Sequence, residues 1–235
     1  MRLLRRTFAF FALVSTLALS SCSALESVEL PPLPDAQGAP VPSTAEQREI
    51  YAESLELLAE IAVKGRAPKT GYDRAKFGKG WKDPDRNGCD ARNDILSRDL
   101  VDVTYKSAAR PCVVLSGRFD DPYTGKTIEF KRGQGTSTAV QIDHVVALSD
   151  SWQKGAQGWD ADTRLEFAND PLNLLASDGP TNAAKGDKDA ASWLPPNKSF
   201  RCDYVSRQTQ VKAKYGVWMT KAEHATIGKL LKSCI

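Results

Sequence analysis

Histidine is scarce in this chain, which has only two, His144 and His224, among its 235 residues. No Cys-x-x-Cys pair occurs, and this argues against a zinc site built from thiolates. The sequence has no internal repeat, and no stretch after the first 21 residues is apolar enough to cross a bilayer. Any chemistry that needs an imidazole must therefore use one of two positions.

The first 21 residues have the pattern of an export signal. Three arginines precede an apolar run from Phe8 to Leu19, which is long enough for a signal peptide and too short for a membrane span. The segment ends in Ser-Ser-Cys22, which resembles a bacterial lipobox and predicts a diacylglycerol on Cys22. Secretion without a lipid is the alternative. We expect an exported protein, held at the extracytoplasmic face of the membrane by its lipid or released.

Net charge is divided unevenly along the chain. The formal charge of +3 falls to zero when the three arginines of the leader are removed. Residues 22–60 hold eight acids and one base, whereas residues 61–235 hold 28 bases and 21 acids, a net of +7. A moderately basic body suits a polyanionic partner such as nucleic acid, although many exported domains are equally basic without one.

Four cysteines remain once Cys22 is assigned to the lipid. An even number in an exported chain favours two disulfides over free thiols. Three pairings are open, and we prefer Cys89 with Cys112 and Cys202 with Cys234, because the second pair would join two adjacent helices near the C-terminus.

The chain reads as a signal peptide (1–21), a tether (22–43) and one domain (44–235). Five prolines mark the tether, whose composition cannot build a core. The remaining stretch of about 190 residues is long enough for a single domain with a real core. We predict an α+β fold that is mainly helical, with a small antiparallel β element.

Local patterns predict the following elements. Capping boxes at Ser43–Glu46 and Thr220–Glu223 begin the first and last helices. Residues 65–88 are loop-like. Further helices are expected at 91–100, 149–157, 162–168, around Asn182 with Thr181 or Asp178 as its cap, and from Asn197 to Gly216; strands are expected at 113–115, 127–131 and 140–146.

Polar residues that could share one site lie in the strand at 140–146 and downstream of it. Asp143 and His144 stand together in it, and Asn173, Asn182 and Lys185 come downstream. Phosphodiester cleavage needs a base for the attacking water, a cation beside the phosphate and stabilisation of the leaving oxygen. Neutral histidine suits the first role, and carboxylate and amide oxygens suit a hard dication. Adjacent strand residues point to opposite faces, so convergence needs a twist or a strand end.

The ordered set Asp143-His144, Asn173 and Asn182-x-x-Lys185 resembles the HNH endonucleases with the ββα-metal fold. The flanking residues are similar to exported actinobacterial members akin to the C-terminal nuclease domain of GmrSD restriction enzymes. The resemblance covers roughly residues 70–235. It implies a ββα-metal core within the α+β domain.

The resemblance also implies a role for each residue. His144 matches the general base, Asp143 and Asn182 match the metal ligands, and Asn173 matches the residue that braces the turn and orients the histidine. Lys185 lies where a phosphate contact is expected. Many HNH enzymes have a metal-binding histidine where this chain has Asn182, which favours Mg²⁺, or Mn²⁺, over Zn²⁺.

Other basic residues are weaker candidates. Arg92, Arg132 and Lys188 are named as phosphate contacts only because the body is basic. His224 has no carboxylate in motif spacing, and we interpret it as structural or surface-exposed.

The sequence thus predicts an exported, metal-dependent endonuclease that cuts DNA with weak sequence preference. Whether it also cuts RNA is left open. The expected partners are nucleic acid and, through the lipid alone, a membrane; a monomer is assumed. A nucleic-acid-binding surface lipoprotein with an inactive site is the main alternative. A structural envelope protein that holds a structural ion such as Ca²⁺ is a third.

Overall fold

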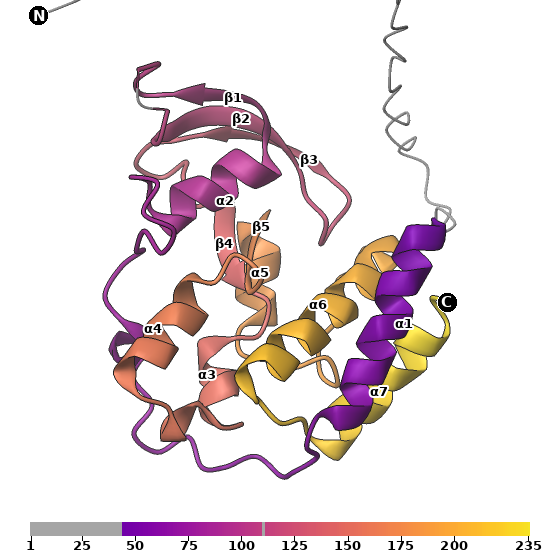
Figure 1. Cartoon of the computed structure of the whole chain (residues 1–235). Coiled ribbons are helices and arrows are strands. Elements are labelled where there is room, and N and C mark those ends of the chain that lie inside the picture. The colour runs from indigo at the N-terminus through magenta and orange to yellow at the C-terminus, as the bar shows by residue number, and fades with distance from the viewer. Residues whose placement is uncertain (1–43, 110) are drawn as a thin grey trace, which may run out of the picture. The chain divides into compact units, whose positions relative to one another are not determined.

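The computed structural model describes residues 44–109 and 111–235, and the chain divides into two units, 1–35 and 36–235. The described residues belong to the second unit (Figure 1). The signal peptide, Cys22 and the tether lie outside them. Among the described residues, none of the helices has the length and apolarity that a membrane crossing requires.

Helices α1, α6 and α7 pack together on one side of the unit (Figure 1). Thr44 caps the start of α1, and its side chain accepts from the backbone N–H of Gln47. This capping box lies one residue later than predicted. The capping box at Thr220 and Glu223 is present as predicted and begins α7. The bounds are α1 Ala45–Glu60, α6 Arg201–Tyr215, which follows the short η3 Lys198–Phe200, and α7 Lys221–Lys232.

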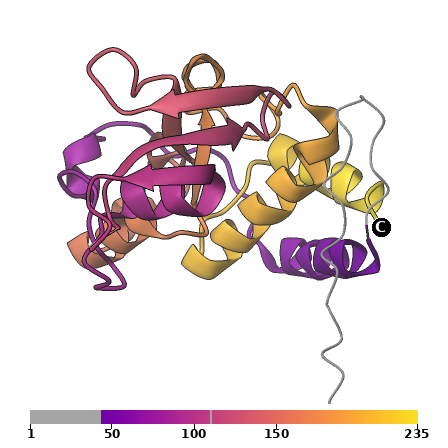
Figure 2. The same cartoon turned by 90° about the horizontal axis from the view of Figure 1, so that it is seen from above.

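A three-stranded antiparallel sheet with order β1-β2-β3 lies at another end, with α2 against it (Figure 2). The turn between β2 and β3 is held by Asp121, whose carboxylate accepts from the backbone N–H groups of Tyr123 and Thr124. β1 was not predicted, and β2 is longer than expected. The bounds are α2 Ala91–Asp99, β1 Val101–Tyr105, β2 Val114–Asp120 and β3 Thr127–Lys131.

A second, two-stranded ladder runs through the middle of the unit. β4 (Val140–His144) pairs antiparallel with β5 (Leu174–Asp178), and α5 (Gly179–Lys185) follows β5 directly. The turn into α5 requires glycine, because a Cβ on Gly179 would lie 2.1 Å from the carbonyl oxygen of Thr138. The order β4-β5-α5 gives a strand pair with a helix behind it (Figure 1).

The connection between β4 and β5 holds short helices. These are α3 Leu148–Trp152, η2 Ala156–Gly158 and α4 Ala161–Asn169. The segment predicted as loop at 65–88 contains one further turn of helix, η1 Arg74–Phe77, which packs against α3 and α4.

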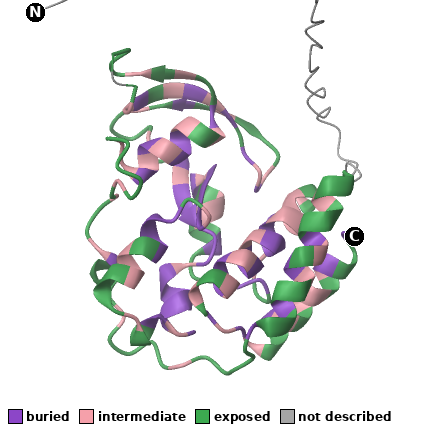
Figure 3. Ribbon diagram, viewed as in Figure 1, coloured by how far each residue is buried: buried purple, intermediate pink, exposed green. Residues whose placement is uncertain are grey.

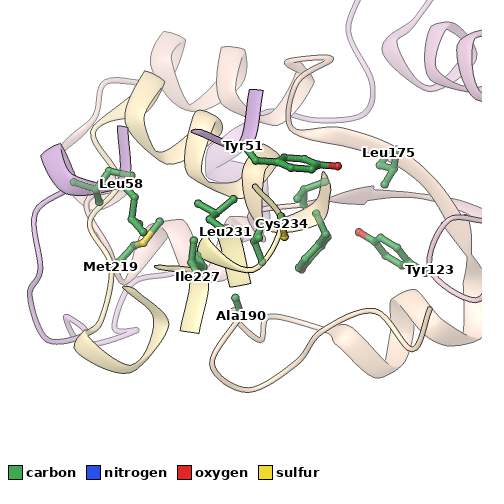
Figure 4. Packing of buried hydrophobic residues seen from close by; sticks show 13 residues of the cluster. Tyr51, Leu58, Tyr123, Leu175, Ala190, Met219, Ile227, Leu231 and Cys234 are labelled. Atoms are coloured by element: carbon green, nitrogen blue, oxygen red, sulfur yellow. The ribbon is translucent and has the colours of Figure 1, made fainter. Parts of the chain in front are cut away.

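The hydrophobic core has three parts, and buried residues line the inner faces of the helices and of β4 and β5 (Figure 3). One cluster joins the three packed helices to the middle of the unit, from Leu58 and Leu231 to Tyr123 and Leu175 (Figure 4). The second lies between α2 and the strands, and the third between η1, α3 and α4.

Both disulfides form with the predicted pairing. Cys89 and Cys112 join the start of α2 to the strand region, with a Cα–Cα distance of 5.1 Å. Cys202 and Cys234 join α6 to the end of α7, 6.0 Å apart. The second bridge connects adjacent helices, as expected. The α+β fold, mainly helical with small antiparallel sheets, is confirmed.

Candidate active site

His144 is the last residue of β4 and is buried, with 6% of its surface exposed. Its ring stacks on Trp81, with centroids 5.8 Å apart and an interplanar angle of 11°. Nε2 lies 2.9 Å from the carbonyl oxygen of Ala168. Because a carbonyl only accepts, Nε2 carries the hydrogen of the neutral ring, and Nδ1 keeps the lone pair that can take a proton.

Burial, helped by the positive charges of Arg74 and Lys185, lowers the pKa of His144 from 6.5 to about 3, against the hydrogen bond to Ala168, which acts to raise it. The imidazole is therefore neutral at every pH above this value. A neutral ring with one fixed tautomer meets the first requirement of a general base.

Asp143 stands next to His144 and contacts different neighbours. Its Oδ2 accepts from the hydroxyl of Tyr123 at 2.6 Å, and its Oδ1 accepts from the ammonium of Lys185 at 2.9 Å. Burial raises the pKa of Asp143, while Lys185 and Tyr123 act to lower it. The two bonds fix the plane of the carboxylate.

Lys185 ends α5 and is fully buried. Its ammonium donates to Asp143 and also to the carbonyl oxygen of His144, 2.9 Å away. Lys185 therefore stabilises the end of β4 through one side-chain and one backbone oxygen. The phosphate contact expected from the sequence is not available to an ammonium in this position.

Asn182 lies in α5, which is capped by Asp178, one of the two residues predicted for that role. Its side chain is half-buried, and Nδ2 donates to Oε1 of Gln141 on β4 at 2.9 Å. Because this bond uses Nδ2, the amide oxygen Oδ1 of Asn182 takes no part in it and could bind a cation.

Asn173 is fully buried just before β5. Its Oδ1 accepts from the backbone N–H of Val146 at 2.8 Å, and Nδ2 reaches the carbonyl oxygens of Val146 and Phe167. Asn173 thus holds the residues that follow His144 against the end of α4.

Asp143, His144 and Asn182 all line one cavity of about 330 Å³. A neighbouring cavity of about 220 Å³ is lined by more apolar residues, including Phe77 and Trp81, and shares His144 with the first. The first cavity is mainly polar; its other lining residues are Tyr72, Arg74, Gln141, Ile142, Ala147, Leu148, Ser149, Gly186 and Asp187.

The three weaker phosphate candidates do not line either cavity. Arg92 donates to the carbonyl oxygens of Ser137 and Val140, and burial together with the charge of Arg132 lowers its pKa. Arg132 donates to the carbonyl oxygen of Val114 and to Asn93. Lys188 donates to the carbonyl oxygen of Ala184. Each of these side chains thus donates to a backbone carbonyl oxygen, and Arg132 also to a side-chain amide.

Several lining residues were not predicted, above all Tyr72, Arg74 and Trp81. They belong to the segment 65–88, which has no helical or strand periodicity and was interpreted as a loop. Its signal was composition, because bases outnumber acids there. His224, by contrast, lies where expected, with Nε2 3.1 Å from the carbonyl oxygen of Leu58, and links α7 to α1.

The oxygen atoms at the first cavity suit a hard dication. No group of three or more histidine, cysteine or acidic side chains that could hold a metal occurs among the described residues. Each oxygen of Asp143 accepts one hydrogen bond and keeps a second lone pair, and the Oδ1 of Asn182 adds an amide oxygen. Two protein ligands with water completing the shell is a common arrangement for Mg²⁺.

Comparison with known proteins gives one full-length relative. The chain is 32% identical over 229 residues to a protein of Arthroderma benhamiae described as "Uncharacterized secreted protein", and the match covers 97% of this chain and 99% of the relative. No solved structure matches.

The family comparison covers the part of the chain that holds the site. Residues 90–230 match the family described as "GmrSD restriction endonucleases, C-terminal domain". The matched stretch includes β4, β5 and α5, with Asp143, His144 and Asn182, and its description is that of a nuclease domain. Since it spans more than half of the chain, the protein belongs to the GmrSD restriction endonuclease C-terminal domain family.

Proposed function

We propose that the protein is an exported, metal-dependent endonuclease of the HNH type that hydrolyses phosphodiester bonds of DNA. The observation that carries this proposal is the shared cavity, which is lined by a carboxylate, an imidazole and an amide from β4 and α5. A strand pair followed by a helix is the arrangement that the HNH resemblance implies. Family membership supports the nuclease class.

In the proposed reaction Nδ1 of His144 removes a proton from the attacking water. The hydrogen bond from Nε2 to Ala168 and the stacking on Trp81 hold the ring in place, so no reorganisation is needed. Asp143 and Asn182 would hold Mg²⁺ or Mn²⁺, which when bound offsets charge on the phosphate and on the departing 3′ oxygen. The product then carries a 5′ phosphate.

Three buried residues support the reacting groups without touching the substrate. Tyr123 and Lys185 orient the carboxylate of Asp143, and Lys185 also holds the end of β4 through its bond to the carbonyl of His144. Asn173 fixes the chain directly after His144. The low pKa of His144 keeps the ring neutral, so that its Nδ1 is free to accept a proton.

Export is supported by the two disulfides and by the secreted relative. We propose further that Cys22 carries a lipid that anchors the protein at the outer face of the membrane. Labelling with a radioactive fatty acid, with a Cys22→Ser variant as the control, tests this anchor.

The activity is tested with supercoiled plasmid and the oxidised protein, with Mg²⁺, Mn²⁺ or EDTA, and with an RNA substrate in parallel. We expect nicking with Mg²⁺ and none with EDTA. His144→Ala should lower the rate by about 10²–10⁴-fold while DNA binding is retained, because it removes the base and no substrate contact. His224→Ala is the matched control, since it removes the other histidine of the chain and lies outside both cavities.

Two results would overturn the proposal. Nicking by His144→Ala at the wild-type rate would remove the mechanism. Binding of DNA with no nicking under any of the metal ions would replace it with the alternative, a nucleic-acid-binding surface lipoprotein that has no catalytic activity.

A further inference from the structure

The segment between α1 and the family-matched region is unusually basic. Residues 64–82, which we name the basic strap, precede the matched residues 90–230. The strap has seven bases and one acid, Asp73, and so a net charge of +6. Its bases are Lys64, Arg66, Lys69, Arg74, Lys76, Lys79 and Lys82.

The strap is fixed to the body along its length. The backbone N–H of Ala67 donates to Gln153, and the indole of Trp152 donates to the carbonyl oxygen of Thr70. Phe77 is buried in the core cluster at α3 and α4, and the backbone N–H of Lys82 donates to Asn169. A segment held at so many points keeps its backbone in a set position against the body.

Several of the strap's basic side chains already form ion pairs or hydrogen bonds within the protein. Arg66 pairs with Asp150 and Asp189, at 2.9 and 2.7 Å. Lys69 pairs with Asp187 at 2.9 Å, and Lys76 donates to the carbonyl oxygen of Gly71.

Arg74 differs from these residues. Its side chain is exposed and has no hydrogen bond or ion pair within the described part of the chain. The neighbouring carboxylate of Asp73 is used otherwise, since it accepts from the backbone N–H of Ala75 and caps η1.

Arg74 lines both cavities, as does His144. It is the only lysine or arginine among the residues lining either cavity, whereas the larger one also has the carboxylates of Asp143 and Asp187. Lys185, the cation expected from the sequence at this site, is buried on Asp143. Arg74 is also near enough to His144 for its charge to lower the pKa of the ring.

We propose that Arg74 binds the phosphate at which the strand is cut, so that the basic strap completes the site from outside the family-matched region. A guanidinium offers two parallel N–H donors that fit two non-bridging phosphate oxygens. These oxygens gain charge as water attacks, and a cationic donor at that point stabilises the transition state more than the bound substrate. The proposal rests on the proposed nuclease function.

The test compares Arg74→Ala and Arg74→Lys with Lys79→Ala as the matched control. Lys79 is an exposed cation of the same strap, and it lines neither cavity. We expect Arg74→Ala to lower kcat by about 10²-fold, as loss of one fixed donor does. Arg74→Lys should recover part of this loss, and Lys79→Ala should stay within about threefold of wild type. Guanidinium ion at millimolar concentration should partly restore Arg74→Ala, which loss of a merely structural contact would not allow.

Binding gives a second measurement that does not depend on cutting. In EDTA, Arg74→Ala should weaken the affinity for a short fluorescent oligonucleotide and lower the slope of log Kd against log salt by about 1. If wild type binds but does not nick, the proposed function fails, and this slope still tests the phosphate contact. If wild type nicks and Arg74→Ala equals Lys79→Ala in kcat and in salt slope, the proposal for Arg74 is wrong while the nuclease function stands.

Discussion

Two groups of charged side chains, both mostly buried, are compensated differently. The first, which we name the ion network, joins three cations and three carboxylates at α3, α6 and α7. The second is the pair of Asp143 and Lys185 at the cavity wall. The network consists of Arg66, Asp150, Lys154, Asp189, Lys212 and Glu223.

In the ion network every carboxylate contacts two or three cations. The fully buried ammonium of Lys154 lies 2.8 Å from both Asp150 and Asp189 and 2.6 Å from Glu223. Lys212, also fully buried, lies 2.5 Å from Glu223. Its charges balance, and its members come from the strap, α3, the loop after α5, α6 and α7. The network therefore connects the layers of the fold.

The direction of the pKa shifts distinguishes the two groups. Burial acts to raise the pKa of Asp150 and of Asp189, but the surrounding cations outweigh it and the pKa of each is lowered. For Asp143 burial prevails over Lys185 and Tyr123, and the pKa is raised. In the network the cations outweigh the effect of burial on Asp150 and Asp189, whereas at the site burial of Asp143 outweighs its one ion pair, with Lys185. The dication proposed at Asp143 would add positive charge beside this carboxylate.

The largest effect on stability should follow from breaking the ion network. Glu223→Gln leaves Lys154 and Lys212 with one carboxylate partner fewer in a buried position, and should lower the free energy of unfolding by about 3–5 kcal/mol. Urea denaturation at pH 7 measures this. Glu166→Gln is the control, since Glu166 lies 3.9 Å from Lys214 at an exposed site and should cost less than about 1 kcal/mol. Equal losses for the two variants would show that the network does not stabilise the fold.

A smaller effect should appear in the pH dependence of stability, and it comes from the site. The folded pKa of His144 is about 3 and its ordinary value 6.5, so between these pH values the unfolded chain binds a proton that the folded protein does not. Stability therefore falls as pH falls through this window, by about 1.4 kcal/mol for each pH unit well below 6.5.

From pH 6.5 to 4.5 the protein should lose about 2 kcal/mol through His144, measured by urea denaturation. His144→Phe should lack this loss. Asp143 has the opposite sign, because its raised pKa makes stability fall as pH rises, but it is present in both proteins. Asp150 and Asp189 of the network, whose pKa values are lowered, lose their contribution only below the ordinary value of 3.8. Parallel curves for wild type and variant would contradict a buried neutral imidazole.

Local patterns predicted what depends on neighbours in the chain. The capping box at Thr220 was predicted from a few residues and is present. The cap of α5 was expected at Thr181 or Asp178 and is Asp178, and the strand expected at 140–146 begins at Val140 but ends at His144. The preferred one of the three possible disulfide pairings is present, and the preference rested only on the adjacency of two helices near the C-terminus.

The rest depends on contacts between distant residues. β5 was missed because Leu174–Asp178 is a short run that lacks alternation, and only pairing with β4 makes it a strand. The ion network joins Arg66 to residues up to Asp189, and no periodicity marks such a set. The strap has no regular pattern, so neither Arg74 at the cavity nor the burial of Lys185 could be read from the sequence.

The smallest effect on stability should come from substitution of Asn182. This substitution tests whether residues of the site, unlike those of the ion network, affect function more than stability. Asn182 is half-buried and makes one side-chain hydrogen bond, to Gln141, so Asn182→Ala should change the free energy of unfolding by only about 1 kcal/mol. If its Oδ1 binds the cation, the Mg²⁺ concentration for half-maximal nicking should rise by about 10–100-fold. Asn182→Asp keeps an oxygen in the same place and should restore most of the affinity. An unchanged Mg²⁺ requirement in Asn182→Ala would remove this residue from the metal site, because a site residue, unlike a network residue, must affect function more than stability.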